Sequence, residues 1–148
     1  ITNCSNNFGP YQHPEKFIPK IITSILAKKK IPIYGNGKNM RDWIYVDDHI
    51  SALKTIAIKG KIGQTYNIGG QNILSNNTIV HLIINLMKKK NINFDPSILV
   101  EYVLDRKGHD FRYAISNKKI NKYLNWYPKY KFKNSLIKTI DWYYKNFK

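Results

Sequence analysis

In the first half of the chain, hydrophobic residues recur with a helical period in two places. Between Pro14 and the run Lys28–Lys30, apolar residues at positions 17, 18, 21, 22, 25 and 26 form one face of a helix of about four turns. A second helix is predicted to begin at Asp47-Asp48, because acidic side chains suit the first turn of a helix. This helix carries Ile50, Leu53 and Ala57.

The second half of the chain contains three more helical patterns. One spans Ser75–Lys90 and directs Ile79, Ile83 and Leu86 inward. Ser116 is predicted to cap a short helix that runs through Tyr123. Either Asn134 or Ser135 is predicted to cap the last helix, whose inward positions are Leu136, Ile140, Tyr143 and Phe147.

Short apolar runs bounded by turn residues predict four strands. They are Ile31–Tyr34, Trp43–Val46, Gln64–Ile68 and Val100–Leu104. The turn Gly35-Asn36-Gly37 closes the first strand, and Gly69-Gly70 ends the third. A polar loop is expected over Asn91–Ser97 and a charged turn over Asp105–Asp110. The chain is therefore predicted to be a mixed α/β unit with short strands and about five helices.

Composition narrows the class of protein. The 148 residues fit one domain, and 43% hydrophobic residues are enough for a packed core. The longest apolar run is far below the roughly 18 residues of a membrane span, so an integral membrane protein is excluded. A single cysteine, Cys4, excludes an internal disulfide framework and a cysteine zinc cluster. The first residues do not resemble a signal peptide, so a cytoplasmic protein is expected. They also lack an initiator methionine, which suggests a fragment.

The net charge of +16 is typical of proteins that bind nucleic acid. However, the basic residues are 22 Lys and only 3 Arg, whereas proteins that read bases rely on Arg. The chain also holds 23 Ile and 17 Asn. Lys, Ile and Asn share A/T-rich codons, so a biased genome explains all three excesses. We expect only weak, non-specific RNA binding at low salt, with no specific nucleic-acid partner.

Polar residues gather in four connections that suit one anionic, hydroxyl-rich ligand. These are Asn6-Asn7 with Lys16, the Gly35–Gly37 turn with Arg41, Asn76, and the segment Asp105–Asp110. Arg offers two parallel donors to a phosphate, and Asn offers a donor and an acceptor to a sugar hydroxyl. A phosphorylated small molecule is therefore favoured as the ligand.

Several longer motifs extend these connections. They are Asn3-Cys4-Ser5-Asn6-Asn7-Phe8-Gly9-Pro10-Tyr11 followed by Pro14-Glu15-Lys16-Phe17-Ile18-Pro19, Ile31-Pro32-Ile33-Tyr34-Gly35-x-Gly37, Arg41-Asp42-Trp43-Ile44-Tyr45-Val46-x-Asp48-His49, Tyr66-Asn67-Ile68-Gly69-Gly70, Asp105-Arg106-x-Gly108-His109-Asp110-x-Arg112-Tyr113 and Leu124-x-Trp126-x-Pro128. In order and spacing, the sequence resembles the dTDP-glucose 4,6-dehydratases of the extended short-chain dehydrogenase superfamily. The resemblance covers essentially the whole chain.

This resemblance implies a fold and an activity. Residues 1–148 would be the C-terminal, nucleotide-sugar-binding domain of such an enzyme, without its N-terminal Rossmann core. Residues 1–10 would form the edge of the missing NAD-binding domain. The family are hydro-lyases of deoxysugar biosynthesis and are usually homodimers. NAD takes a hydride from sugar C4, water leaves across C5 and C6, and the hydride returns to C6.

The resemblance also implies roles for individual residues. Asn6 would contact the substrate, and Asn7 would lie against the nicotinamide end of NAD. Lys16 and Phe17 would border the nucleotide, Arg41 would hold the pyrophosphate, and Asn76 would add a polar contact. The remaining expected substrate contacts are Pro32, Ile33 and Tyr34 around the base, and Asp105, Arg106, Lys107, Gly108 and His109 closing over the sugar and phosphates.

No catalytic residue and no metal site is expected within this chain. In the family, the Gly-x-x-Gly-x-x-Gly loop that binds most of NAD, the acid pair and the Tyr-x-x-x-Lys dyad all lie N-terminal to this stretch. The glycine-rich loop does not occur here. Tyr-x-x-x-Lys occurs at Tyr34/Lys38, Tyr127/Lys131 and Tyr144/Lys148. A glycine turn, Pro128 and a fraying helix end, respectively, argue against each as the dyad.

Two departures from the family pattern count against full activity, and two other functions stay open. Lys107 stands where the family usually has Pro, and Phe111 where it usually has Arg. One alternative is a related nucleotide-sugar epimerase or decarboxylase. Another is a non-catalytic remnant with weak RNA binding. His49 and His81 are expected to be structural or surface residues, and the Tyr and Trp residues of the last segment to be core or subunit contacts.

Overall fold

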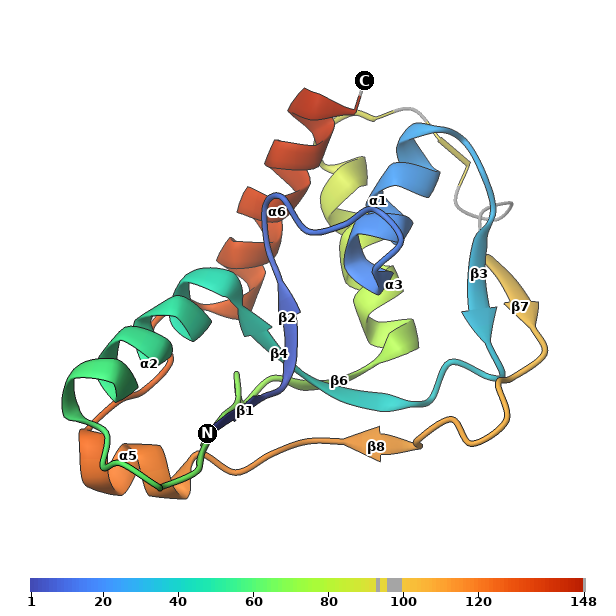
Figure 1. Ribbon diagram of the computed structural model, residues 1–148. Coiled ribbons are helices and arrows are strands. Elements are labelled where there is room, and N and C mark those ends of the chain that lie inside the picture. The colour runs from blue at the N-terminus through green and yellow to red at the C-terminus, as the bar shows by residue number, and fades with distance from the viewer. Residues whose placement is uncertain (93, 96–99, 148) are drawn as a thin grey trace.

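A computed structural model describes residues 1–92, 94–95 and 100–147. The strands are β1 (Thr2–Cys4), β2 (Asn6–Phe8), β3 (Ile31–Tyr34), β4 (Met40–Tyr45), β5 (Tyr66–Ile68), β6 (Ile73–Ser75), β7 (Val100–Val103) and β8 (Arg112–Tyr113). The helices are α1 (Phe17–Leu26), α2 (Val46–Lys59), α3 (Asn76–Lys88), α5 (Lys118–Leu124) and α6 (Phe132–Asn146). These elements confirm the predicted mixed α/β class, with five helices in the described part of the chain (Figure 1).

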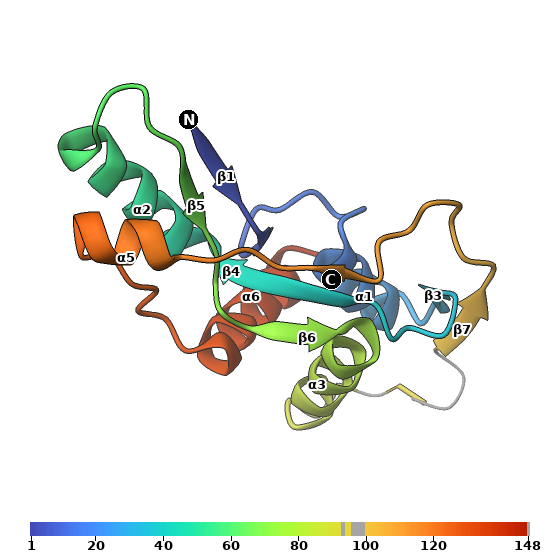
Figure 2. The ribbon, with the colours of Figure 1, turned by 90° about the horizontal axis from the view of Figure 1, so that it is seen from below.

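The strands form three small sheets. β4 is the centre of the largest, pairing in parallel with β2 and β8 and antiparallel with β6. β1 pairs in parallel with β5, and β3 with β7. Figure 1 shows α1, α3 and α6 grouped together, and Figure 2 shows α2 and α5 beside β1 and β5 at the other end of the molecule. The sheet of β4 connects these two ends.

Each end of the molecule has its own hydrophobic cluster. The larger cluster lies among α1, α3, α6 and β3 and includes Trp43 and Tyr45 of β4. The smaller cluster lies among α2, β5 and α5 and includes Ile44 of β4, which lies between those two residues. Alternate residues of a strand point to opposite faces, so β4 supplies side chains to both clusters.

The helices at α1, α2 and α3 lie where the hydrophobic pattern predicts them. Ile79, Ile83 and Leu86 of α3 are buried, as expected. Asp47 and Asp48 occupy the first turn of α2, which confirms the predicted start of that helix. The expected apolar positions Ile50 and Leu53 are exposed, however, and Ala52 is buried instead. The inward face of α2 is narrow, since Asp48 and Ala52 are its buried residues.

The predicted start of the last helix is wrong, and that of α5 differs by one residue. Asn117 is the N-cap residue of α5, and its side chain bonds to the backbone of Gly69 instead of capping the helix. The hydroxyl of Ser116, the predicted cap, accepts from the backbone N–H of Lys118 at 3.3 Å. α6 has Lys131 as its N-cap residue, three or four positions before the predicted Asn134 or Ser135. Phe147 follows that helix and is 41% exposed, although its ring lies beside Trp142 and Tyr143.

The predicted strands Ile31–Tyr34 and Val100–Leu104 correspond to β3 and β7, and Gln64–Ile68 contains β5. The predicted strand Trp43–Val46 begins later than β4, which already starts at Met40, and Val46 belongs to α2. The expected polar loop Asn91–Ser97 includes positions 93, 96 and 97, which lie outside the described residues. No helix in the described ranges is long and apolar enough to cross a membrane.

The buried carboxylate of Asp48 fixes how the chain enters α6. It is 2% exposed and accepts hydrogen bonds from the backbone N–H groups of Lys129 and Tyr130, at 2.7 and 3.2 Å. Burial raises the pKa of the Asp48 carboxyl above its ordinary value, against the opposing effect of these two hydrogen bonds. The folded protein therefore binds a proton at this site more readily than the unfolded chain does.

This raised pKa gives a testable pH dependence. The stabilisation that comes from it is fully present below the ordinary carboxyl pKa and is lost as the pH rises through the folded value. We expect the free energy of unfolding of the unmodified chain, minus that of Asp48→Asn, to fall as the pH rises above the ordinary carboxyl pKa of about 4. Urea unfolding at each pH measures the difference. A difference that stays flat or rises with pH would contradict the effect of burial at Asp48.

Candidate functional site

The pairing of strands brings the predicted site residues together. β2 and β4 are parallel and in register, so that Asn6 lies beside Trp43. Arg41 and Trp43 are two residues apart on β4 and therefore point to the same face. On β3, Pro32 and Tyr34 share one face, whereas Ile31 and Ile33 share the other and are each 1% exposed in the larger cluster.

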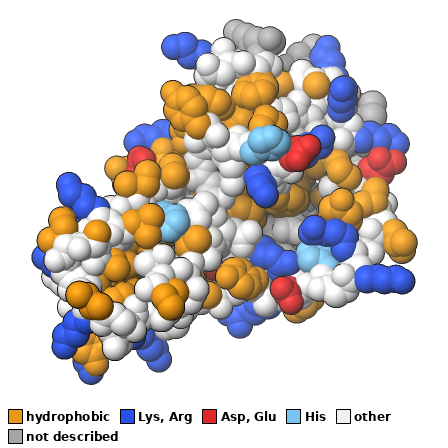
Figure 3. Space-filling model, in the orientation of Figure 1, with side chains coloured by type: hydrophobic (Ala, Val, Ile, Leu, Met, Phe, Trp, Pro, Cys, Tyr) orange, Lys and Arg blue, Asp and Glu red, His pale blue; other side chains and the backbone are white. Residues whose placement is uncertain are grey.

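These side chains line a pocket of about 410 Å³ between α1, β3, β4 and the turn after β7. Figure 3 shows the molecule hollowed on this face, with Lys, Arg and His side chains around the hollow. The lining residues are Asn6, Glu15, Lys16, Phe17, Lys20, Pro32, Tyr34, Arg41, Trp43, Asn76, Arg106 and His109. The volume falls in the range of ordinary small-molecule sites.

The charge of the pocket favours an anion. Lys16, Lys20, Arg41 and Arg106 contribute four cationic side chains, against one carboxylate from Glu15. The guanidinium of Arg41 donates to the carbonyl oxygen of its neighbour Met40 at 2.8 Å. Because that bond uses one of five N–H donors, the group retains donors for a phosphate.

Aromatic rings supply flat walls to the same pocket. The rings of Phe17 and Trp43 lie nearly parallel, with centroids 6.1 Å apart and an interplanar angle of 22°. On the β3 side, the ring of Tyr34 is partly exposed. The guanidinium carbon of Arg106 lies 4.6 Å from the centre of the Tyr34 ring, a cation–π distance. The pocket thus combines flat apolar walls with cationic side chains, which suits a ligand with both a planar ring and phosphate groups.

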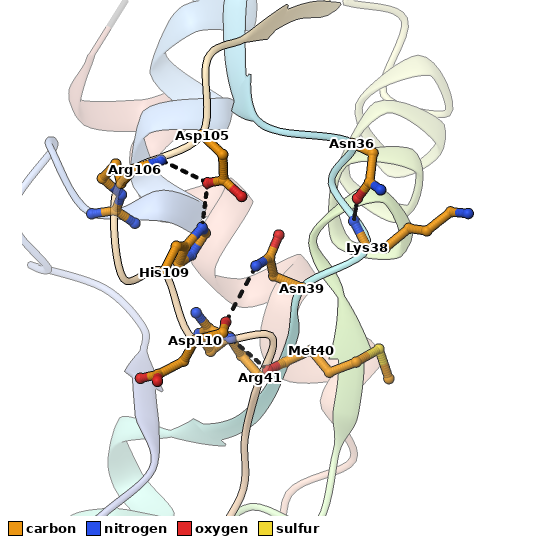
Figure 4. A network of polar contacts seen from close by, with 9 residues as sticks. All are labelled: Asn36, Lys38, Asn39, Met40, Arg41, Asp105, Arg106, His109 and Asp110. Atoms are coloured by element: carbon orange, nitrogen blue, oxygen red, sulfur yellow. Dashed lines mark hydrogen bonds and ion pairs between the residues drawn. The ribbon is translucent and has the colours of Figure 1, made fainter.

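The turn Asp105–Asp110 is held against β3 and β4 (Figure 4). Nδ1 of His109 lies 2.7 Å from Oδ1 of Asp105, and Oδ1 also accepts from the backbone N–H of Arg106 at 2.8 Å. The hydrogen bond from His109 is the largest cause that lowers the pKa of the Asp105 carboxyl. At the far end of the turn, the Asn39 amide donates to the carbonyl oxygen of Asp110 at 3.2 Å.

Nine of the thirteen expected substrate contacts line the pocket. They are Asn6, Lys16, Phe17, Pro32, Tyr34, Arg41, Asn76, Arg106 and His109. Ile33 does not line it, because its side chain points into the core. Asp105, Lys107 and Gly108 belong to the turn beside the pocket but are not among its lining residues. Asn7, expected at the cofactor, lines a separate hollow of about 300 Å³ with Phe8, Gly9 and Gln12.

Glu15, Lys20 and Trp43 line the pocket but were not among the expected site residues. Two of them carried a usable signal in the sequence. Lys20 is four positions after Lys16, a spacing that places two side chains on one side of a helix. Trp43 is two positions after Arg41 in a strand, so both must face the same way. Glu15 is the neighbour of Lys16 and had no comparable signal.

A buried carboxylate supports the strand that carries Arg41 and Trp43. Asp42 is 1% exposed and accepts from the backbone N–H groups of Gly70 and Asn72, at 3.1 and 2.9 Å. Burial raises the pKa of the Asp42 carboxyl, which these hydrogen bonds only partly offset. Gly70 lies so close to β4 that a Cβ at this position would overlap the carbonyl oxygen of Trp43.

The other residues discussed from the sequence lie away from the pocket. His49 is half-buried and His81 is exposed, and neither lines it. Tyr34 and Tyr127 lie outside the helices, which agrees with rejecting their Tyr-x-x-x-Lys spacings, and Lys148 is outside the described residues. Among residues 1–92, 94–95 and 100–147, no three His, Cys, Asp or Glu side chains could hold a metal ion together.

Known proteins with similar sequences agree with the motif resemblance. The model of a family described as GDP-mannose 4,6 dehydratase matches residues 1–139. A dTDP-glucose 4,6-dehydratase of Escherichia coli is 48% identical, over 99% of this chain and 42% of the relative. A second, from Xanthomonas campestris pv. campestris, is 44% identical, over 98% of this chain and 42% of the relative. The chain thus spans well under half the length of these curated relatives.

Solved structures show the same relationship. DesIV, a dTDP-glucose 4,6-dehydratase from Streptomyces venezuelae solved with NAD and TYD bound, has a TM-score of 0.92 and 39% identity, over 99% of this chain and 44% of that one. The dTDP-glucose 4,6-dehydratase of Bacillus anthracis, solved with NAD, has a TM-score of 0.89 and 47% identity, over 98% and 44%. A UDP-glucose 4-epimerase from Thermotoga maritima, 24% identical with a TM-score of 0.87, shares the fold.

The fold and the ordered motifs therefore lead to one assignment. The extended short-chain dehydrogenase fold expected from the sequence is the fold of these neighbours. The family match extends over nearly the whole chain, and the relatives at 44–48% identity are dTDP-glucose 4,6-dehydratases. The chain belongs to the GDP-mannose 4,6 dehydratase family.

Proposed function

We propose that this chain is the nucleotide-sugar-binding part of an NAD-dependent dTDP-glucose 4,6-dehydratase, a hydro-lyase of deoxysugar biosynthesis. The observation that carries the proposal is that one pocket combines four cationic side chains with an aromatic wall. A nucleoside diphosphate has both a planar base and two adjacent phosphates. The 44–48% identical relatives bear the same enzyme name.

In this proposal, each part of the pocket meets one part of the substrate. Arg41, with Lys16 and Lys20 near it, holds the diphosphate by charge-assisted hydrogen bonds. Tyr34 and Pro32 form the wall for the base, and the exposed Tyr34 ring offers a stacking face. Asn6 and Asn76 offer amide groups to hydroxyls. By holding the diphosphate, the pocket positions the sugar for reaction.

NAD is the proposed cofactor, and one group in this chain fits it. Nδ2 of Asn7 lies 3.3 Å from Sγ of Cys4 and 3.2 Å from the carbonyl oxygen of Ser5. Oδ1 of Asn7 is buried with no hydrogen-bond partner among the described residues, so it is free to accept from the nicotinamide carboxamide. When bound, NAD supplies the hydride acceptor and donor. Asn7 holds one end of it, and the residues that bind the rest lie outside this chain.

The proposed domain organisation follows from β1. This strand pairs with β5 along one edge, and within the described ranges no strand pairs with its other edge. Parallel sheets are normally covered on both faces and extended by further parallel strands. We propose that residues 1–10 form the edge of an NAD-binding domain, and that residues 1–148 otherwise form the substrate domain. A cytoplasmic homodimer is the proposed state of the whole enzyme.

Calorimetric titration with three nucleotides tests the proposal. The 148-residue chain is titrated with thymidine, uridine and guanosine diphosphate under one salt condition. We expect saturable binding of all three to the cationic pocket, with thymidine diphosphate the tightest. Tighter binding of uridine diphosphate would instead favour an epimerase or decarboxylase. If no nucleotide saturates and the chain binds RNA with a steep salt dependence, it is a basic remnant, because such binding follows counterion release.

A further inference from the structure

We propose that Asp105 is a positioning residue that acts on the ligand only through His109, an inference that rests on the proposed function of the pocket. The resemblance placed all five residues from Asp105 to His109 over the substrate. Only Arg106 and His109 of these five line the pocket. The Asp105 carboxylate instead points toward the His109 ring and bonds to it, as Figure 4 shows.

The Asp105 carboxylate is fixed from three directions. Oδ1 accepts from the backbone N–H of Arg106 at 2.8 Å and lies 2.7 Å from Nδ1 of His109. Its other oxygen, Oδ2, lies against Gly35, where an added Cβ would be only 2.8 Å away. Gly35 also has φ +58°, a conformation that glycine adopts without strain. The carboxylate therefore packs closely against the turn Gly35–Gly37.

The His109 ring is held just as closely. Its side chain is 7% exposed, whereas that of Asp105 is 43% exposed. The ring meets Tyr34 edge-on, with centroids 6.5 Å apart and an interplanar angle of 83°. Arg106 lies over the same tyrosine ring. Three side chains that line the pocket, Tyr34, Arg106 and His109, thus meet at one turn, and of these three His109 is the one whose side chain bonds to Asp105.

The hydrogen bond also decides which nitrogen of His109 faces the ligand. The lowered pKa of Asp105 keeps its carboxylate ionised, so it accepts, and Nδ1 of the ring carries the proton. Nε2 is then the nitrogen left for the pocket. When the ring holds both protons, Nε2–H donates to a phosphate oxygen and the carboxylate balances the charge of the ring. This role accounts for the presence of an acidic side chain beside a site for anions.

A double-mutant cycle separates this role from direct contact. Binding of thymidine diphosphate to the full chain is measured by calorimetry for Asp105→Ala, His109→Ala and the double variant. We expect Asp105→Ala alone to weaken binding by 3- to 10-fold, and to have less than a twofold effect once His109 is alanine. Asp105→Asn, which keeps an acceptor oxygen, should stay within twofold of the unmodified chain. Equal effects of Asp105→Ala in both backgrounds, or none in either, would overturn the proposal.

A second measurement needs no ligand. Long-range proton–nitrogen correlation spectra report which ring nitrogen of His109 carries the proton. We expect Nδ1 to be protonated in the unmodified chain and in Asp105→Asn, and the Nε2–H tautomer to appear in Asp105→Ala. An unchanged His109 signal in Asp105→Ala would refute the positioning role even if all variants bind nucleotide. Conversely, a chain that shows the tautomer change but binds no nucleotide would refute the proposed function and leave the Asp105–His109 pair established.

Discussion

Replacing Arg41 by alanine should weaken the binding of thymidine diphosphate by about 1.5–3 kcal/mol, the usual contribution of a hydrogen bond to a charged group. Arg41 lies on β4, faces the pocket beside Trp43, and bonds within the protein only to the carbonyl of its own neighbour Met40 among the contacts described. Its loss therefore removes a phosphate contact without breaking a contact between elements. Calorimetric titration of the variant against the unmodified chain measures the effect.

Arg112→Ala is the matched control for this prediction. Arg112 lies on β8, which pairs with β4 beside Met40, and its side chain is exposed and outside the main pocket. Both substitutions remove one guanidinium, so a general loss of positive charge would weaken binding equally in the two variants. We expect the affinity of Arg112→Ala to stay close to that of the unmodified chain. Equal losses would mean that Arg41 makes no specific contact with the phosphates.

Gly70→Ala should lower the free energy of unfolding by about 4 kcal/mol, near the upper end for a single substitution. A Cβ on Gly70 would overlap the carbonyl oxygen of Trp43 and lie 2.7 Å from Cα of Ile44. Both obstacles are backbone, so no side-chain rotation can relieve them. The segment would have to move away from β4 and would break the hydrogen bonds from Gly70 and Asn72 to Asp42.

Gly63→Ala is the control for the loss of a glycine. Gly63 has φ +77°, and nothing lies within 4 Å of an added Cβ. Its substitution should therefore cost only the conformational penalty, about 1–2 kcal/mol. Urea unfolding compares the two variants. We also expect Gly70→Ala to bind nucleotide more weakly, because β4, which carries Trp43, would lose its hydrogen bonds with Gly70 and Asn72 and shift. Similar stabilities of the two variants would show that Gly70 tolerates a side chain.

Periodicity predicted the longer elements well, because their packing repeats over several turns. The apolar stripe of α3 is the clearest case. It did not predict β2, β6 and β8, which have two or three residues each and are defined only by their partners on β4. The predicted starts of the last two helices differ from the observed starts for a related reason. Asn117 bonds to Gly69, and Asp48 holds Lys129 and Tyr130, so contacts distant in the sequence decide where α5 and α6 begin.

The motifs identified the region of the candidate site. The direction of each side chain then decides whether that residue lines the pocket. Ile33 stands between Pro32 and Tyr34 in the sequence but faces the core, because neighbouring residues of a strand point apart. Asp105 belongs to the motif that reaches the pocket, yet its carboxylate faces His109 and Gly35. Lys20 and Trp43 line the same pocket, as their spacings from Lys16 and Arg41 could have predicted.

The alternation along β4 restricts how the gene for this protein can change in length. Trp43 and Tyr45 belong to one hydrophobic cluster and Ile44 to the other. An insertion or deletion of one codon between Arg41 and Trp43 would put these two side chains on opposite faces of β4, so that they could no longer both line the pocket. We expect descendants of this sequence to vary in length at exposed turns such as that around Gly63, and to keep the spacing from Arg41 to Tyr45 unchanged.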